Sequence, residues 1–162
     1  MAENEMCCPP FDPAPWDGIT HEWKDKPFIT DSIPQFMHIP FPGAMKKMMT
    51  RIWKKAEDLG IAPEQKDFLL LSYDPSPWKS VYYLAVTKAH PEAKTVALSG
   101  KYLSRVFDGP YSQVPVFLKQ MEKTVASEDM TALKYYFYYT TCPACAKKYG
   151  HNYIVAIAEV MS

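Results

Sequence analysis

The most distinctive chemical motif in the sequence is the Cys-Pro-Ala-Cys segment that runs from Cys142 to Cys145; near the other end of the chain, Cys7 and Cys8 are adjacent. Two residues between cysteines let both sulfurs face one point, the spacing of a zinc half-site and of a thiol–disulfide pair. The four thiolates would complete a zinc site if the N-terminal segment folds back, although adjacent cysteine side chains diverge. Three interpretations stay open: a zinc site, a redox or nucleophilic role, and reduced cysteines with no joint function.

Glu159 and His38 are the candidate catalytic residues for acid–base chemistry. Glu159 lies in an apolar C-terminal run, and a carboxylate there is costly to bury unless it is paired or has a function. At a frayed strand end it would simply be solvated. His38 lies shortly before Pro40, where a neutral imidazole can act as acid or base and where a lone histidine can equally be capped or solvated.

Aromatic residues are abundant, with 11 Tyr, 8 Phe and 4 Trp. Tyr136 and Tyr138 share one face of a tyrosine-rich strand, and the strand's other aromatic residues lie on the opposite face. We expect the rings of one face to pack on the helices and the rings of the other face to contact a ligand. Trp78, beside the turn at residues 74–77, and Tyr111, at a helix start, lie where the rim of a groove is expected. These four residues are the candidate ligand-binding residues, and ordinary core or cross-strand packing is the alternative for each.

Charge and motif content exclude several classes of protein. Lys plus Arg and Asp plus Glu are both 18, which gives a formal net charge of zero, so neither a nucleic-acid partner nor a polybasic membrane patch is indicated. The sequence has no GxSxG, HExxH, P-loop or GxGxxG motif. Its apolar runs are too short to cross a bilayer and its start lacks the features of a signal peptide, so we expect a cytoplasmic protein.

Two helices are predicted from apolar residues that recur every three or four positions. Pro42 and Gly60 bound the first helix, as helix punctuation predicts. Its apolar set is Met45, Met48, Met49, Ile52, Trp53, Ala56 and Leu59. The second helix follows Gly109-Pro110, and Pro115 confines its regular part to what comes after. Its buried stripe is Val114, Phe117, Leu118, Met121 and Val125.

Strands are predicted on both sides of these helices, where β-branched and aromatic residues are enriched. Their expected ranges are 28–39, 67–73, 80–87, 95–107, 133–139 and 152–160. The chain thus has the order β-α-β-β twice. The predicted fold class is α+β, a duplicated β-α-β-β module whose antiparallel sheet has two helices on one face and a ligand groove on the other.

A single core is expected for 162 residues. Residues 1–26 show no periodicity, and we expect an irregular N-terminal arm packed on the domain, because its aromatic residues favour burial. The domain itself is assigned to residues 27–162, with repeats at about 27–90 and 94–161.

The second repeat carries a family resemblance in residues 98–102 (LSGKY) and 106–111 (VFDGPY). These segments resemble the GyrI-like domain, a duplicated β-α-β-β module that binds amphipathic small molecules in a groove between its repeats. In some stand-alone forms it is a hydrolase of cyclopropane-bearing toxins. Residues 7–11 (CCPPF) and 140–150 (TTCPACAKKYG) resemble a stand-alone subgroup labelled hydrolase. The resemblance implies a ligand groove and leaves an activity open.

One position departs from the family pattern. Ligand-binding members of the family carry a glutamate in the final strand, where this sequence has Val155. Glu159, four residues later and on the same strand face, can substitute for it.

Three functions follow from the sequence as alternatives. The first is a cytoplasmic GyrI-like protein that binds an amphipathic or aromatic small molecule between its repeats. The second is a hydrolase of a strained or electrophilic molecule in the same groove, and the third is a zinc- or thiol-dependent protein that uses the four cysteines. The expected partner is a small molecule, zinc is the one candidate cofactor, and the oligomeric state is left open.

Overall fold

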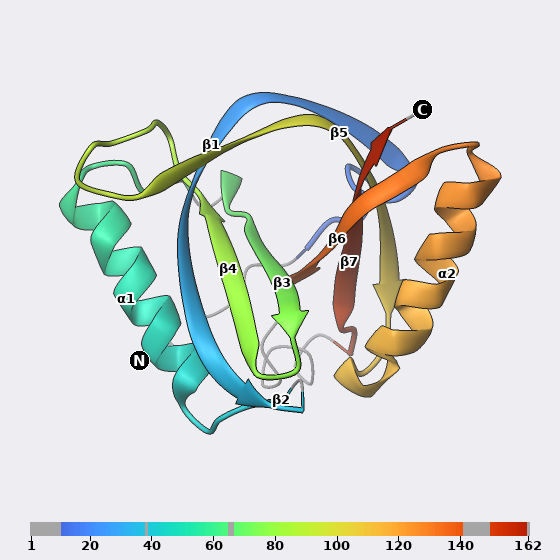
Figure 1. The fold of residues 1–162 in the computed structure, drawn as a ribbon, viewed down its shortest axis with the longest axis horizontal. Helices are drawn as coiled ribbons and strands as arrows, with labels where there is room; N and C mark the ends of the chain where they lie inside the picture. The colour runs from blue at the N-terminus through green and yellow to red at the C-terminus, as the bar shows by residue number, and fades with distance from the viewer. Residues whose placement is uncertain (1–10, 38, 65–66, 141–149, 162) are drawn as a thin grey trace. The chain divides into compact units, whose positions relative to one another are not determined.

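The computed structural model describes residues 11–37, 39–64, 67–140 and 150–161 of the chain, and its strands and helices divide into two compact units. Unit 1 comprises residues 1–22 and 100–162, and unit 2 comprises residues 23–99. The long strands β1 (Ile19–Phe36) and β5 (Thr95–Asp108) each have residues in both units. Figure 1 shows one helix beside the strands of each unit.

Unit 2 contains most of β1 and four further elements. These are β2 (Ile39–Pro40), α1 (Ala44–Asp58), β3 (Leu70–Ser76) and β4 (Lys79–Ala85). The strands pair antiparallel in the order β2-β1-β4-β3.

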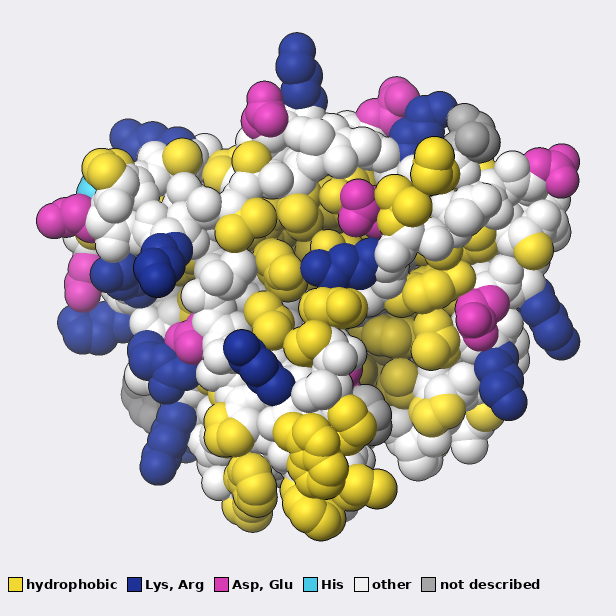
Figure 2. Space-filling model, viewed as in Figure 1, with side chains coloured by type: hydrophobic (Ala, Val, Ile, Leu, Met, Phe, Trp, Pro, Cys, Tyr) yellow, Lys and Arg dark blue, Asp and Glu magenta, His cyan; other side chains and the backbone are white. Residues whose placement is uncertain are grey.

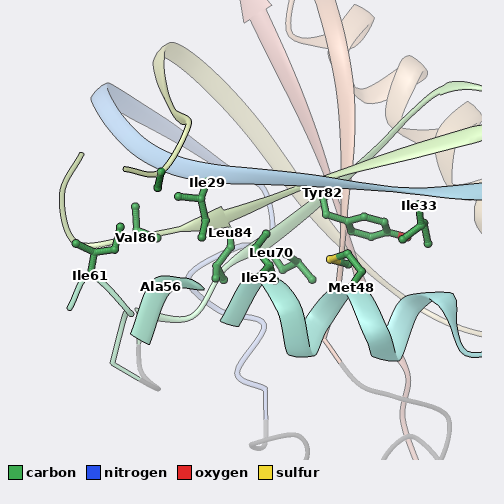
Figure 3. Packing of buried hydrophobic residues seen from close by; sticks show 11 residues of the cluster. Ile29, Ile33, Met48, Ile52, Ala56, Ile61, Leu70, Tyr82, Leu84 and Val86 are labelled. Atoms are coloured by element: carbon green, nitrogen blue, oxygen red, sulfur yellow. The ribbon is translucent and has the colours of Figure 1, made fainter. Parts of the chain in front are cut away.

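The core of unit 2 lies between α1 and this sheet. Met48, Ile52 and Ala56 come from one face of α1, because residues four apart in a helix share a face. They pack with strand residues such as Ile29 and Leu84 (Figure 3). The apolar spacing in the sequence therefore identified this helix and its buried face.

An ion pair also joins α1 to β1. The Arg51 guanidinium donates from Nε to Asp31 Oδ2 at 2.7 Å and from Nη2 to Oδ1 at 2.8 Å. Partial burial alone would raise the pKa of Asp31, but hydrogen bonds from Arg51 and the Ser32 N–H, together with the guanidinium charge, lower it.

Unit 1 repeats this arrangement with the last part of the chain. After β5 come the short 3-10 helix η3 (Tyr111–Gln113), α2 (Val114–Ser127), β6 (Thr131–Tyr139) and β7 (Tyr153–Met161). The strand order is β6-β7-β5, again antiparallel. Phe117, Met121 and Val125 of α2 pack with Ile154 and Ala156 of β7.

The two units thus share one topology. In each, the first strand of the β-α-β-β module pairs with the last, and the last also pairs with the third. The prediction of an α+β protein with two α-helices and antiparallel strands is confirmed.

Several strand boundaries differ from the sequence prediction, and two of the differences have a clear physical reason. β1 begins at Ile19, not near Phe28, and the start of the strand is polar and largely exposed, so it carries no apolar alternation. β3 extends to Ser76, which pairs with Lys79 after an irregularity in the ladder. The expected turn at residues 74–77 is therefore shortened, because strand pairing resumes within it.

The residues before β1 are tied to β5 within unit 1. Ser104, fully buried, donates from Oγ to the Trp16 carbonyl at 2.6 Å, and its own carbonyl accepts from the Gly18 N–H at 3.0 Å. Asp17 Oδ1 accepts from the Val106 N–H at 3.1 Å. In the described part of the chain, neither helix is long and apolar enough to cross a bilayer.

Candidate functional site

Alternation along β6 sorts its aromatic residues onto two faces of the unit 1 sheet. Tyr135, Phe137 and Tyr139 pack against the core that α2 covers. Tyr136 and Tyr138 lie on the opposite face, where they pair in register with Ile157 and Val155 of β7. We call this opposite face, with its residues from β5, β6 and β7, the second sheet face. It is buried: Tyr102 and Tyr136 are each 1% exposed and Tyr138 is 7% exposed.

Glu159 belongs to the same face, at the far end of β7. In the strand ladders it is opposite Tyr102 on one side and Lys134 on the other. Its side chain is partly exposed, so it is neither fully buried nor simply solvated. The ladder therefore brings Glu159 onto the same sheet face as Tyr136.

Two neighbours set the electrostatics around Glu159. Burial, and secondarily the negative charge of Glu159, raises the pKa of Tyr102 to about 12, so this phenol is neutral at physiological pH. The Lys134 ammonium lies 5.1 Å from the centre of the Tyr136 ring, within the range of a cation–π interaction. The site therefore combines an acidic side chain, a basic side chain and two tyrosine rings on one sheet face.

The end of this face nearer the start of β7 is covered by residues that precede β1. The Phe11 ring lies 6.0 Å from Tyr138 in a T-shaped arrangement and 5.9 Å from Tyr153. Trp16 lies 6.0 Å from Tyr138 as well. Tyr138 thus packs against the N-terminal segment, whereas Tyr136 lies next to Lys134.

Neither Tyr111 nor Trp78 belongs to this sheet face. Tyr111 is half-exposed at the start of η3, and its ring contacts Tyr139, whose side chain packs on the α2 side of the sheet. Trp78 belongs to unit 2, where its ring lies 5.5 Å from that of Phe36.

Trp78 is part of an exposed apolar patch on unit 2. Its side chain is 54% exposed. The other large apolar side chains exposed on this part of the unit are Phe36, Met37, Ile39 and Phe41. Figure 2 shows hydrophobic side chains gathered around β2 and the β3–β4 turn.

The remaining predicted site residues lie outside the described part of the chain. They are His38, Cys7, Cys8, Cys142 and Cys145. Among the residues that are described, no group of three or more His, Cys, Asp or Glu side chains could hold a metal ion. The zinc and thiol interpretations therefore stay predictions.

A histidine–carboxylate pair that the sequence did not predict lies at the other end of the same sheet. His151 Nδ1 is 2.7 Å from Asp108 Oδ2, and Asp108 Oδ1 accepts from the Asn152 N–H at 2.9 Å. Partial burial alone would raise the pKa of Asp108, but these hydrogen bonds and the charge of a protonated His151 lower it. The Asp108 carboxylate is therefore ionised at neutral pH.

The sequence does not indicate this pair. Asp108 belongs to the motif at residues 106–111, and His151 is 43 positions away. Asp108 is the last residue of β5 and His151 lies just before the start of β7, and only the antiparallel pairing of these strands brings the two side chains together.

A family model described as bacterial hydrolase matches residues 1–160. The chain belongs to the bacterial hydrolase family. No curated protein shows significant sequence similarity to this family member.

Solved structures share the fold of this bacterial hydrolase family member at low sequence identity. A hydrolase from Listeria innocua aligns with a TM-score of 0.67 and 12% identity, over 98% of this chain and 97% of the other. The EcmrR C-terminal domain aligns with a TM-score of 0.66 and 10% identity, over 91% and 98% of the two chains. SAV2435 bound to tetraphenylphosphonium aligns with a TM-score of 0.50 and 10% identity, over 89% and 93%. The resemblance to the GyrI-like fold is thus confirmed, and identities this low establish the fold alone.

Proposed function

We propose that this bacterial hydrolase family member binds a small aromatic molecule on the second sheet face of unit 1, and that this face becomes accessible when the ligand binds, because Tyr102 and Tyr136 are buried without it. The observation that carries the proposal is the placement of Glu159 on the same face as Tyr136 and Tyr102. Ligand sites commonly combine aromatic walls with a few polar groups that fix orientation. The tetraphenylphosphonium bound to SAV2435, a protein of the same fold, supports this choice by analogy.

Lys134 and Glu159 together determine which ligand charge the site prefers. The Lys134 ammonium already occupies a cation–π position above Tyr136 at 5.1 Å. A cationic ligand that stacks on this ring has to displace the ammonium, while the Glu159 carboxylate attracts the cation. For two ligands of similar shape and opposite charge, Glu159 therefore favours the cation and Lys134 favours the anion.

Tetraphenylphosphonium and tetraphenylborate test this because they have similar shapes and opposite charges. The measurement is the affinity of each ion by calorimetry, at fixed ionic strength. Glu159→Gln should weaken phosphonium binding about tenfold, and Lys134→Gln should strengthen it by a similar factor and weaken borate binding. Glu122→Gln is the matched control, because Glu122 is exposed on α2, which packs on the other face.

Two results would contradict the binding proposal. One is that neither ion binds the wild-type protein. The other is that both ions bind and Tyr136→Ala, Glu159→Gln and Glu122→Gln all leave the affinities unchanged. The same titrations with Trp78→Ala and Tyr111→Ala test the two candidate ligand-binding residues that lie elsewhere.

Hydrolysis on the same face is a second candidate, favoured by membership of the bacterial hydrolase family. In this case Glu159 holds a water molecule against a strained or electrophilic ligand. Glu159→Gln should then abolish turnover and leave binding nearly intact, whereas in a pure binding protein it alters affinity alone. His38→Asn tests the other candidate catalytic residue in the same assay.

The cysteines offer a third function, which mass spectrometry can test separately. If Cys7, Cys8, Cys142 and Cys145 bind zinc, native mass spectra should show a zinc surplus that disappears on denaturation, and a strong chelator should lower the melting temperature. Four freely alkylated thiols without a mass surplus would exclude a structural zinc site.

A further inference from the structure

The ends of β5 and β7 form a second chemically organised site in unit 1. Asp108 is opposite Tyr153 in the ladder, and Glu159 lies six residues further along β7, a distance of about 20 Å in a strand. The site at Asp108 is therefore separate from, and independent of, the proposed ligand contacts around Glu159.

The His151 ring is held in place from two sides. Asp108 Oδ2 lies 2.7 Å from its Nδ1, and the ring stacks on Tyr153 with centroids 5.2 Å apart and planes at 12°. The carboxylate is itself oriented by the Asn152 N–H, and Asn152 Nδ2 donates to the Gly109 carbonyl at 2.7 Å. This network fixes the imidazole relative to the ends of both strands.

The partner also determines the tautomer of a neutral His151. An ionised carboxylate can only accept hydrogen bonds, so Nδ1 must carry the proton. Nε2 then has a lone pair available to take a proton from another molecule. This is the arrangement that a general base requires.

A shallow cavity of about 480 Å³, wide open to solvent, lies beside the pair. Its described lining includes Pro110 and Tyr111, which give it an apolar wall. Asp108, Tyr111 and His151 are the titratable side chains among the described lining residues, and His151 is 54% exposed. With His151 neutral, the Asp108 carboxylate has hydrogen bonds from His151 and Asn152 but keeps its negative charge, so the lining disfavours anions and accepts a neutral molecule.

We propose that His151 is a general base for hydrolysis of a neutral carboxylic ester held against Pro110 and Tyr111, with Asp108 as its positioning residue. Nε2 takes a proton from water while the water oxygen forms a bond to the ester carbonyl carbon. The carbon–oxygen bond to the alcohol then breaks, and the imidazolium returns the proton to the departing alkoxide. The products are one carboxylic acid and one alcohol, and no other reactant is consumed.

The first experiment follows hydrolysis of 4-nitrophenyl acetate by the full-length protein. Because the chain has four cysteines that can be acetylated, only turnover beyond four equivalents of 4-nitrophenol per chain is counted. His151→Gln should lower this steady rate about 10²- to 10⁴-fold, the usual contribution of a general base. His90→Asn is the control, since the described hydrogen bond of His90 is to the Glu92 N–H, and it should leave the rate unchanged.

The second experiment tests Asp108 through the nitrogen-15 spectrum of the His151 ring. Asp108→Asn leaves one acceptor oxygen for two donors, the His151 Nδ1–H and the Asn152 N–H. The new NH₂ group can instead donate to Nδ1 of His151. The neutral ring should then change from the Nδ1–H to the Nε2–H tautomer, and the rate should fall with it. A purely structural pair would show the same spectral change with no effect on the rate.

Chemical rescue separates loss of the base from loss of structure. His151→Ala should regain turnover on addition of free imidazole, beyond the rate of imidazole alone, if the cavity is intact. The proposal is overturned if the wild-type protein does not turn over the ester. It is equally overturned if His151→Gln retains the full rate, or if imidazole gives His151→Ala no more than its own background.

Discussion

Tyr102 and Glu159 are direct partners in the β5–β7 ladder, and this pairing places a buried phenol beside a partly exposed carboxylate on the second sheet face. Burial and then the charge of Glu159 raise the pKa of Tyr102 to about 12. The neutral phenol is therefore a hydrogen-bond donor over the whole physiological range.

The raised pKa of Tyr102 predicts a loss of stability at high pH. Folding raises the pKa of this phenol, so its contribution to stability is complete at pH values below its unfolded pKa of about 10. The contribution is lost as the pH rises through the folded pKa of about 12. Urea unfolding between pH 8 and 11 should show a steeper decline for the wild type than for Tyr102→Phe. Parallel declines in the two proteins would contradict the shift.

Glu159→Gln should lower the pKa of Tyr102 only in part, because burial is the larger cause of the shift. Absorbance titration at 295 nm, as the difference between each protein and its Tyr102→Phe counterpart, measures this directly. If the midpoint of Tyr102 does not move in Glu159→Gln, the two side chains do not interact electrostatically.

The Arg51–Asp31 pair should contribute weakly to the stability of unit 2, and only while Asp31 is ionised. Its geometry is bidentate, but both side chains are accessible to solvent, so a double-mutant cycle with Arg51→Met and Asp31→Asn should give a coupling of about 1 kcal/mol or less. The pKa of Asp31 is lowered on folding, so the coupling is present above its unfolded pKa and disappears as pH falls through the folded one. A coupling that persists in strong acid would exclude an ionic origin.

Met48 and Met121 should be equivalent core residues of the two units. Both are fully buried on the inner faces of α1 and α2, so each Met→Ala change should cost about 2–5 kcal/mol in the free energy of unfolding. Leu133→Ala is the control, because Leu133 is 57% exposed and its loss should stay within about 0.5 kcal/mol. Losses of equal size at all three positions would contradict the assigned core.

Phe11→Ala should have opposite effects on stability and on ligand binding. It removes the ring contacts with Tyr138 and Tyr153, which are worth about 1 kcal/mol each. It also uncovers Tyr138, so affinity for tetraphenyl ions should rise if the N-terminal segment and the ligand compete for contact with the Tyr138 ring. Phe41→Ala, an exposed aromatic residue of unit 2, should change neither quantity.

The sequence by itself determined the helices, most strands and the duplicated module. The apolar spacing from Met45 to Leu59 and the stripe from Phe117 to Val125 identified the buried helix faces, because helical periodicity depends on local side-chain order. The motifs at residues 98–102 and 106–111 led to the GyrI-like fold for the same reason: they are contiguous. The start of β1 was missed because its residues are polar and paired through the backbone.

Only the tertiary structure decided which side chains meet. Strand register alone placed Lys134 and Tyr102 on either side of Glu159, and alternation alone could not supply that register. The placement of Tyr111 against Tyr139, apart from Tyr136, likewise depended on how η3 packs. Asp108 and His151 meet because antiparallel pairing joins the end of one strand to the start of another across 43 residues, a relationship without a local signal in the chain.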